Sequence, residues 1–201
     1  MLIVAKMIPY RPGPNRKLGL KKVRKDQSLL ESEGQLNLFQ PKKVNTSIKR
    51  IHNLDPFEQA LQLDGKNEEL AEKLYLEAIN RQVSAADALC NLGILRARRG
   101  DTAKAVDCFT GALRADPRHA EAHYNLANMY YDAGSTDLAI THYEIASEMD
   151  HPFAEIFFNL ALAYLSNGQK EQAKRQLESF LNVCDDGEAR EAERLLQLLT
   201  S

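Results

Sequence analysis

Residues 120–153 read AEAHYNLANMYYDAGSTDLAITHYEIASEMDHPF, and this stretch decides the fold because its pattern recurs on both sides. A leucine followed by a small residue occurs three times at a spacing of 34 residues, and each leucine precedes an alanine by 13 residues. These positions are Leu92-Gly93, Leu126-Ala127 and Leu160-Ala161, followed by Ala105, Ala139 and Ala173. A period of this length is typical of helix-turn-helix units that bury their apolar faces only by stacking on neighbours. The sequence therefore predicts an all-α solenoid of helix pairs.

The three units resemble the tetratricopeptide repeat (TPR) family, whose pattern is an aromatic residue, Leu-Gly, Tyr, Ala, Phe and Pro at set offsets. Arg96 departs from the pattern where the family usually has Tyr, and Phe180 departs from it where the family usually has Ala. The resemblance implies a right-handed superhelical solenoid of TPR helix-turn-helix repeats with a C-terminal capping helix. In residues 120–153 the pattern is matched by His123, Leu126, Ala127, Tyr130, Gly134, Ala139, Tyr143 and Ala146.

The domain organisation follows from this register. Residues 1–54 are predicted to form an arm, and residues 55–201 a TPR domain that opens at Asp55-Pro56, a good N-cap and first-turn pair. A polar-backed apolar helix at the end is expected because the last repeat of a solenoid would otherwise expose its stacking surface. The predicted units are a degenerate repeat at 55–85, full repeats at 86–119, 120–153 and 154–187, and a capping helix at 188–199.

Small residues explain how the two helices of a unit pack and how the chain turns between them. A glycine such as Gly93 allows the first helix to approach the second closely. Gly100 and Gly134 are expected to end the first helices, and the side chains of Asp101 and Ser135 are expected to cap the second helices.

Composition favours a cytoplasmic protein without a membrane span. The chain has 44% hydrophobic residues, no Trp and no apolar run near the ~20 residues that cross a bilayer. The opening Met1-Leu2-Ile3-Val4-Ala5 is shorter than the apolar core of a secretory signal. Three scattered cysteines favour reduced thiols over a disulfide framework.

Charge divides the chain into a basic arm and an acidic body. The first 50 residues hold 12 basic and three acidic side chains, a balance of +9, whereas the remainder holds 14 basic and 25 acidic, a balance of −11. The arm lacks helical periodicity and is rich in Pro and Gly, so it is predicted to be disordered when free. It could make weak contacts with nucleic-acid phosphates, or it could reach the acidic body of its own chain.

By the resemblance, an extended peptide of a protein partner binds in a concave groove lined by the first helices. Two rows recur there: an amide row, Asn91, Asn125 and Asn159, and an acidic row, Asp87, Glu121 and Glu155. The amides could pair with a peptide backbone or serve helix packing, and the carboxylates could form a binding row or an ordinary solvated face. The acidic row and the aromatic residues favour a basic or neutral segment with apolar anchors over an acidic C-terminal tail. The remaining predicted groove residues are Arg98, Tyr124, Asn128, Tyr131, Phe158 and Leu162.

The arm carries one short motif. Gln35-Leu36-Asn37-Leu38-Phe39 resembles the pentapeptide by which many bacterial proteins dock on the DNA polymerase sliding clamp. In that interpretation Leu38 and Phe39 enter an apolar pocket, while Gln35 forms hydrogen bonds at its rim and Leu36 supplies the aliphatic position. The same cluster could instead fold back on its own domain or be a passive linker.

Catalytic chemistry has no support in the pattern, and neither a cofactor nor a metal is predicted. No phosphate-binding glycine loop or nucleophile setting occurs. His119 and His123 lie four residues apart and could form a metal pair or be two structural histidines. The sequence therefore predicts a non-enzymatic adaptor, and the alternative is a DNA-associated accessory or regulatory factor that acts through its arm. The oligomeric state is not predicted.

Overall fold

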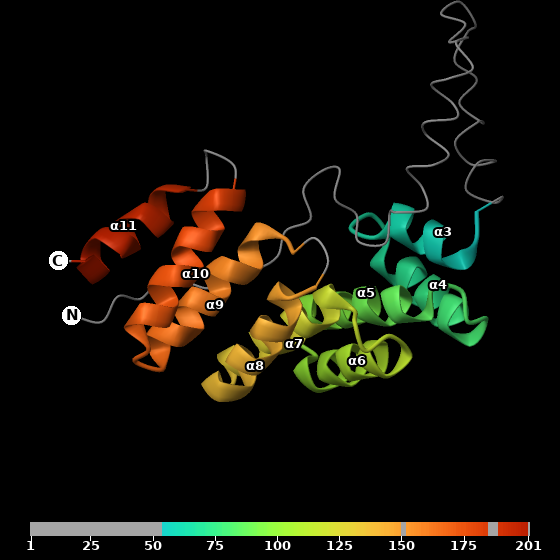
Figure 1. Ribbon diagram of the computed structural model, residues 1–201. Helices are drawn as coiled ribbons and strands as arrows, with labels where there is room; N and C mark the ends of the chain where they lie inside the picture. Colours follow the sequence, from blue (N-terminus) through green and yellow to red (C-terminus); the bar gives the residue numbers. More distant parts are fainter. Residues whose placement is uncertain (1–53, 150–151, 185–188, 201) are drawn as a thin grey trace, which may run out of the picture.

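The computed structural model describes residues 54–149, 152–184 and 189–200, and all regular secondary structure in these ranges is α-helical. Predictions for the arm lie outside the described residues. The chain passes in order through α3 to α11 (Figure 1). The helices are α3 (Pro56–Leu63), α4 (Glu68–Asn80), α5 (Ala85–Arg98), α6 (Thr102–Ala115), α7 (Ala120–Asp132), α8 (Thr136–Ser147), α9 (Ala154–Ser166), α10 (Lys170–Val183) and α11 (Ala189–Thr200).

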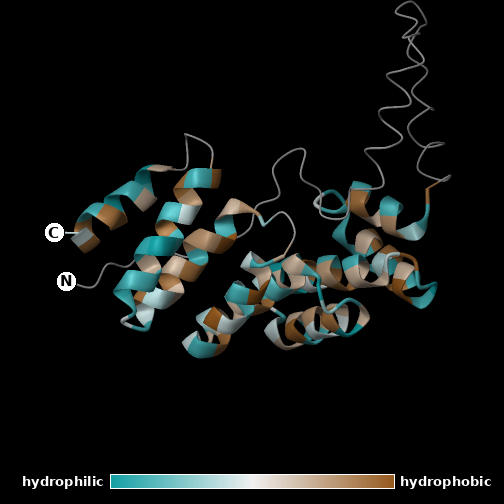
Figure 2. Ribbon diagram, viewed as in Figure 1, coloured by the Kyte–Doolittle hydropathy of each residue, from teal (hydrophilic) through white to brown (hydrophobic). Residues whose placement is uncertain are grey.

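Each helix packs mainly on the helices before and after it in the sequence, which confirms the predicted all-α solenoid of helix pairs. The pairs are α3 with α4, α5 with α6, α7 with α8, and α9 with α10, and α11 packs on α10. Most helices carry both hydrophobic and hydrophilic residues (Figure 2), as expected of elements that bury one face against a neighbour. Among the described residues no helix is both long and apolar enough to span a bilayer.

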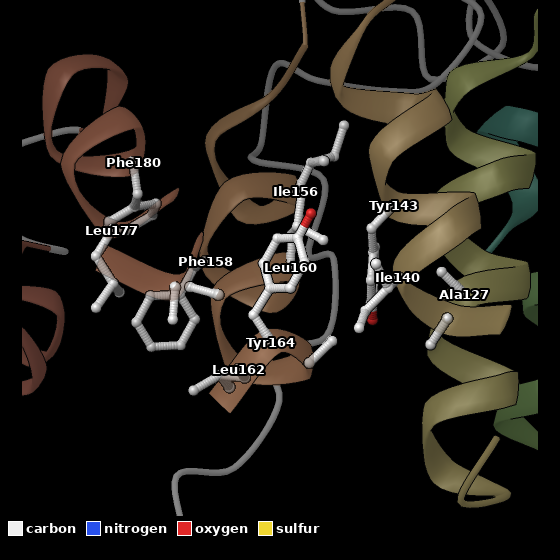
Figure 3. Packing of buried hydrophobic residues seen from close by; sticks show 14 of the residues in the cluster. Ala127, Ile140, Tyr143, Ile156, Phe158, Leu160, Leu162, Tyr164, Leu177 and Phe180 are labelled. Atoms are coloured by element: carbon white, nitrogen blue, oxygen red, sulfur yellow. The ribbon is translucent and has the colours of Figure 1, made fainter. Parts of the chain in front are cut away.

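Alanines and large rings alternate in the core. Ala105, Ala139 and Ala173 have no exposed surface, as expected of residues at a close approach of two helices. In the last full repeat, Phe158 of α9 packs on Phe180 of α10 with ring centroids 5.2 Å apart (Figure 3). Phe180 therefore fills with a ring the place where the family usually has an alanine.

The turns between helices confirm the glycine part of the sequence prediction but not its capping part. Gly100 and Gly134 adopt φ angles of +79° and +77°, a region that favours glycine because it has no Cβ atom. Neither the side chain of Asp101 nor that of Ser135 forms a cap hydrogen bond, so that expectation was wrong. The Asp101 carboxylate instead accepts a hydrogen bond from Lys104 Nζ at 2.6 Å.

The degenerate repeat contains both of its helices. α3 begins with a capping box, in which the Asp55 carboxylate accepts from the Glu58 backbone N–H at 2.9 Å and Glu58 accepts from the Asp55 N–H at 3.3 Å. Phe57 and Ala60 on α3 are buried against α4 and α5, which gives this short helix an apolar anchor. α4 begins at Glu68 with Asn67 as its N-cap.

Arginines at the end of α5 form ion pairs with acidic residues of the degenerate repeat. Arg99 contacts Glu68 at 3.3 Å and Glu72 at 2.5 Å, and Arg98 contacts Glu68 at 3.7 Å as well as Asp64. Nearby, Arg96, at the place where the family usually has Tyr, donates to Cys108 Sγ at 3.3 Å and lies 3.7 Å from Glu72. Charge thus supplements apolar packing at this junction.

Candidate protein-interaction surface

The twelve predicted groove residues lie on the first helices α5, α7 and α9, and they divide by burial. Those with accessible surface are Asp87, Arg98, Glu121, Asn125, Asn128, Tyr131 and Glu155. Those that are buried are Asn91, Tyr124, Phe158, Asn159 and Leu162. Only the first group offers side-chain surface in this conformation.

Two members of the amide row are oriented in the same way. Asn91 Nδ2 donates to the Asp87 backbone carbonyl at 2.8 Å, and Asn125 Nδ2 donates to the Glu121 carbonyl at 2.8 Å. Each amide group is thus held by its own helix, four residues back, through its donor end. The acceptor oxygens of the two side chains are left for other contacts, and they stand one repeat apart.

Asn159, the third amide, belongs to the core. Its Nδ2 donates to the Tyr124 hydroxyl at 2.8 Å and to Asn128 Oδ1 at 3.2 Å, and the Tyr143 hydroxyl also donates to Asn128 Oδ1. The sequence suggested that the amides face solvent, but Asn91 is only 5% exposed and Asn159 is fully buried. Asn159 links the second and third full repeats, a role that its sequence position does not distinguish from that of Asn125.

Most of the predicted aromatic anchors pack inside the solenoid. The ring of Tyr124 lies against Tyr143 at 5.8 Å and edge-on to Phe153 at 4.9 Å. Tyr131 retains accessible surface, and its hydroxyl lies 2.7 Å from Ser166 Oγ on α9. Tyr131 is therefore the aromatic residue of the set that a partner could contact.

The acidic row contains a histidine that the sequence pattern did not assign to it. His119 Nε2 lies 3.3 Å from Asp87 Oδ1, and His119 Nδ1 lies 3.4 Å from Glu121 Oε2. His119 is also the N-cap of α7, because its Nδ1 accepts a hydrogen bond from the Ala122 N–H at 3.2 Å. Burial lowers the pKa of His119, but the contact with Asp87 and the charge of Glu121 outweigh it, so the pKa is raised overall.

His123 pairs with a residue that sequence spacing could not indicate. Its Nδ1 lies 2.9 Å from His142 Nδ1 on α8, and its Nε2 lies 3.1 Å from the Pro117 carbonyl oxygen. Tyr130 stacks on His142 with ring centroids 5.5 Å apart. Burial lowers the pKa of both histidines. His119 and His123 thus have different partners, and no group of three metal-ligating side chains occurs within the described ranges.

The motif of Gln35, Leu36, Leu38 and Phe39 lies outside the described residues, so its role stays a prediction. The predicted basic phosphate contacts of the arm lie there too.

The stacked helix pairs and their 34-residue register define a class of helical-repeat proteins. Residues 90–150 and 130–179 match a family model described as Tetratricopeptide repeat. The chain belongs to the tetratricopeptide repeat family. Members of this family are generally non-catalytic protein-interaction modules.

Solved structures share the fold at low sequence identity. MamA residues 41–end from Desulfovibrio magneticus RS-1 aligns with a TM-score of 0.59 at 20% identity, covering 78% of this chain and 85% of that one. A tetratricopeptide repeat protein from Parabacteroides merdae aligns with a TM-score of 0.59 at 20% identity, covering 76% and 60%. The first TPR of Spaghetti (RPAP3), bound to an HSP90 peptide, aligns with a TM-score of 0.52 at 22% identity, covering 57% and 90%. A comparison with curated proteins found no match.

Proposed function

We propose that this protein is a non-catalytic adaptor that binds an extended segment of a protein partner along α5, α7 and α9. The observation that carries the proposal is the matched orientation of Asn91 and Asn125, whose donor ends are held by their own helices at 2.8 Å. Their acceptor oxygens are suited to backbone N–H groups of an extended chain. The similar TPR structure bound to an HSP90 peptide supports a peptide as the ligand class.

The acidic row and Tyr131 give the proposed segment its chemistry. Side chains of Asp87 and Glu121 are 36% and 30% exposed, so a basic residue could reach them from solvent. Tyr131 offers an aromatic surface for an apolar residue. The partner segment is therefore basic or neutral, in contrast to an acidic C-terminal tail.

A peptide library presented to the full-length chain tests this function. We expect basic and neutral peptides to bind, and we expect the double variant Asn91→Ala/Asn125→Ala to lose them. Asn182→Ala, which changes an exposed amide on α10, is the matched control and should bind like the unmodified chain. If the library binds the double variant and the unmodified chain equally, the amide row is not the binding site.

The alternative function, a DNA-associated factor, depends on the arm and stays a prediction. Neither the described residues nor the comparisons support the nucleic-acid contact. Deletion of residues 1–50 distinguishes the two functions, because it should abolish clamp or DNA binding while leaving peptide binding in place. The cytoplasmic location is likewise a proposal.

A further inference from the structure

Two carboxylates from consecutive repeats converge on one imidazole. Asp87 comes from the first turn of α5 and Glu121 from the first turn of α7, and His119 lies between them at 3.3 and 3.4 Å. His119 is only 6% exposed, whereas the two carboxylate side chains are about one-third exposed. A ligand from solvent can therefore reach the carboxylates but not the imidazole behind them.

The imidazole has two alternative arrangements of bonds. In the neutral ring, Nδ1 accepts the Ala122 N–H and caps α7. Nε2 is buried and has no hydrogen-bond partner among the described residues, although Asp87 Oδ1 is within ion-pair distance. In the protonated ring, Nδ1–H can no longer accept from Ala122, and Glu121 Oε2 at 3.4 Å becomes its acceptor. Protonation thus exchanges a helix cap for an ion pair and reduces the charge of the three-residue group from −2 to −1.

The surroundings make this group distinct from the other repeats. The other ionisable groups that act on His119 or its two carboxylates are Asp116 in the preceding loop, Cys90 on α5 and His123 on α7. The equivalent place in the third full repeat is Phe153, which packs on Tyr124 at 4.9 Å. In the first full repeat it is Ala85. Of these three positions, only the second holds a side chain that can take up a proton.

We propose that a proton on His119 and a lysine or arginine side chain of the bound partner compete for the carboxylates of Asp87 and Glu121. The inference rests on the proposed function and adds the regulation of that site. A cation between the carboxylates repels the imidazolium, so its binding releases the proton, and by linkage the proton weakens the binding of the cation. The affinity for basic segments therefore rises with pH as His119 becomes neutral.

Calorimetric titration of the full-length chain with an acetylated, amidated tetralysine peptide tests the competition. We expect binding to be at least about fivefold tighter at about pH 8 than at about pH 5.5, since the histidine titrates in this range while lysine stays charged. His119→Asn should bind equally at both pH values, because Asn is a good N-cap that does not titrate. His142→Gln is the matched histidine control and should keep the pH dependence.

Three outcomes overturn the inference: equal affinity of the unmodified chain at the two pH values, a pH dependence that persists in His119→Asn, or no tetralysine binding at either pH. None of them contradicts peptide binding as such. That function fails only if every peptide of the library leaves the chain unbound. Circular dichroism of each variant at both pH values verifies that the helices are intact.

Discussion

The ring of Phe109 on α6 packs directly against the backbone of α5 at Gly93. A Cβ atom at residue 93 would lie 2.6 Å from Phe109 Cε1 and 2.8 Å from Cδ1. Such distances are well inside van der Waals contact, and Phe109 is only 1% exposed, so the ring has little room to move. The small residue of the repeat pattern is therefore required at this position by one neighbouring ring.

Gly93→Ala should destabilise the chain by ~1–3 kcal/mol because the added methyl group overpacks this contact. Gly111→Ala on α6 is the matched control, since its Cβ would lie 3.5 Å from the methyl groups of Leu89. In the control, alanine should gain ~0.5–1 kcal/mol from its helix preference. Urea denaturation monitored by circular dichroism measures both, and a Gly93→Ala chain as stable as the unmodified one would contradict the packing argument.

Asn159→Ala should cost ~1–3 kcal/mol because it removes a buried donor from Tyr124 and Asn128. Asn125→Ala should cost less than about 1 kcal/mol, since that amide is half-buried and bonds to its own helix. Thermal unfolding of the two variants gives the comparison. Equal losses would mean that the three amides are equivalent.

The pair of His123 and His142 should make the chain less stable in acid. Burial lowers both pKa values below the unfolded value of about 6.5, so the unfolded chain binds more protons below that pH. The stabilisation is complete above about pH 6.5 and is lost as the pH falls through the folded pKa values. Urea midpoints at about pH 7 and about pH 5 should differ less in His123→Gln/His142→Gln than in the unmodified chain.

His119 acts in the opposite direction and serves as the internal comparison. Its raised pKa contributes stability that is present below the unfolded value and is lost as the pH rises through the folded pKa. His119→Asn should therefore leave the acid-side loss in place. An acid-side loss that disappears in this variant would assign the effect to the wrong histidine.

The ion pairs of Arg98 and Arg99 with Asp64, Glu68 and Glu72 should make the degenerate repeat sensitive to salt. These side chains are partly exposed, so added salt screens them. Arg98→Ala/Arg99→Ala should lower the thermal midpoint at low ionic strength, and the difference should shrink in about 1 M NaCl. A difference that is unchanged by salt would indicate lost packing of the arginine side chains instead.

Periodicity alone was sufficient to predict the helix pairs, because a solenoid repeats the same local contacts every 34 residues. The predicted turns at Gly100 and Gly134 are present with positive φ angles, and the second helices follow them. Side-chain capping by Asp101 and Ser135 was not predicted correctly, since a capping residue type does not decide which neighbour its oxygen will accept from. For Asp101 the competing partner is Lys104.

Only the tertiary structure separated the amides of the candidate surface. Asn125 and Asn159 hold the same place in the repeat, yet one bonds to its own helix and the other joins two repeats through Tyr124 and Asn128. The contact of His123 with His142, 19 residues away, is likewise invisible in the repeat pattern. By itself the sequence determined the helix pairs, because its small residues and glycine turns act within one repeat. Burial, hydrogen-bond partners and proton affinities were decided by the folded chain, because each depends on side chains that only stacking brings together.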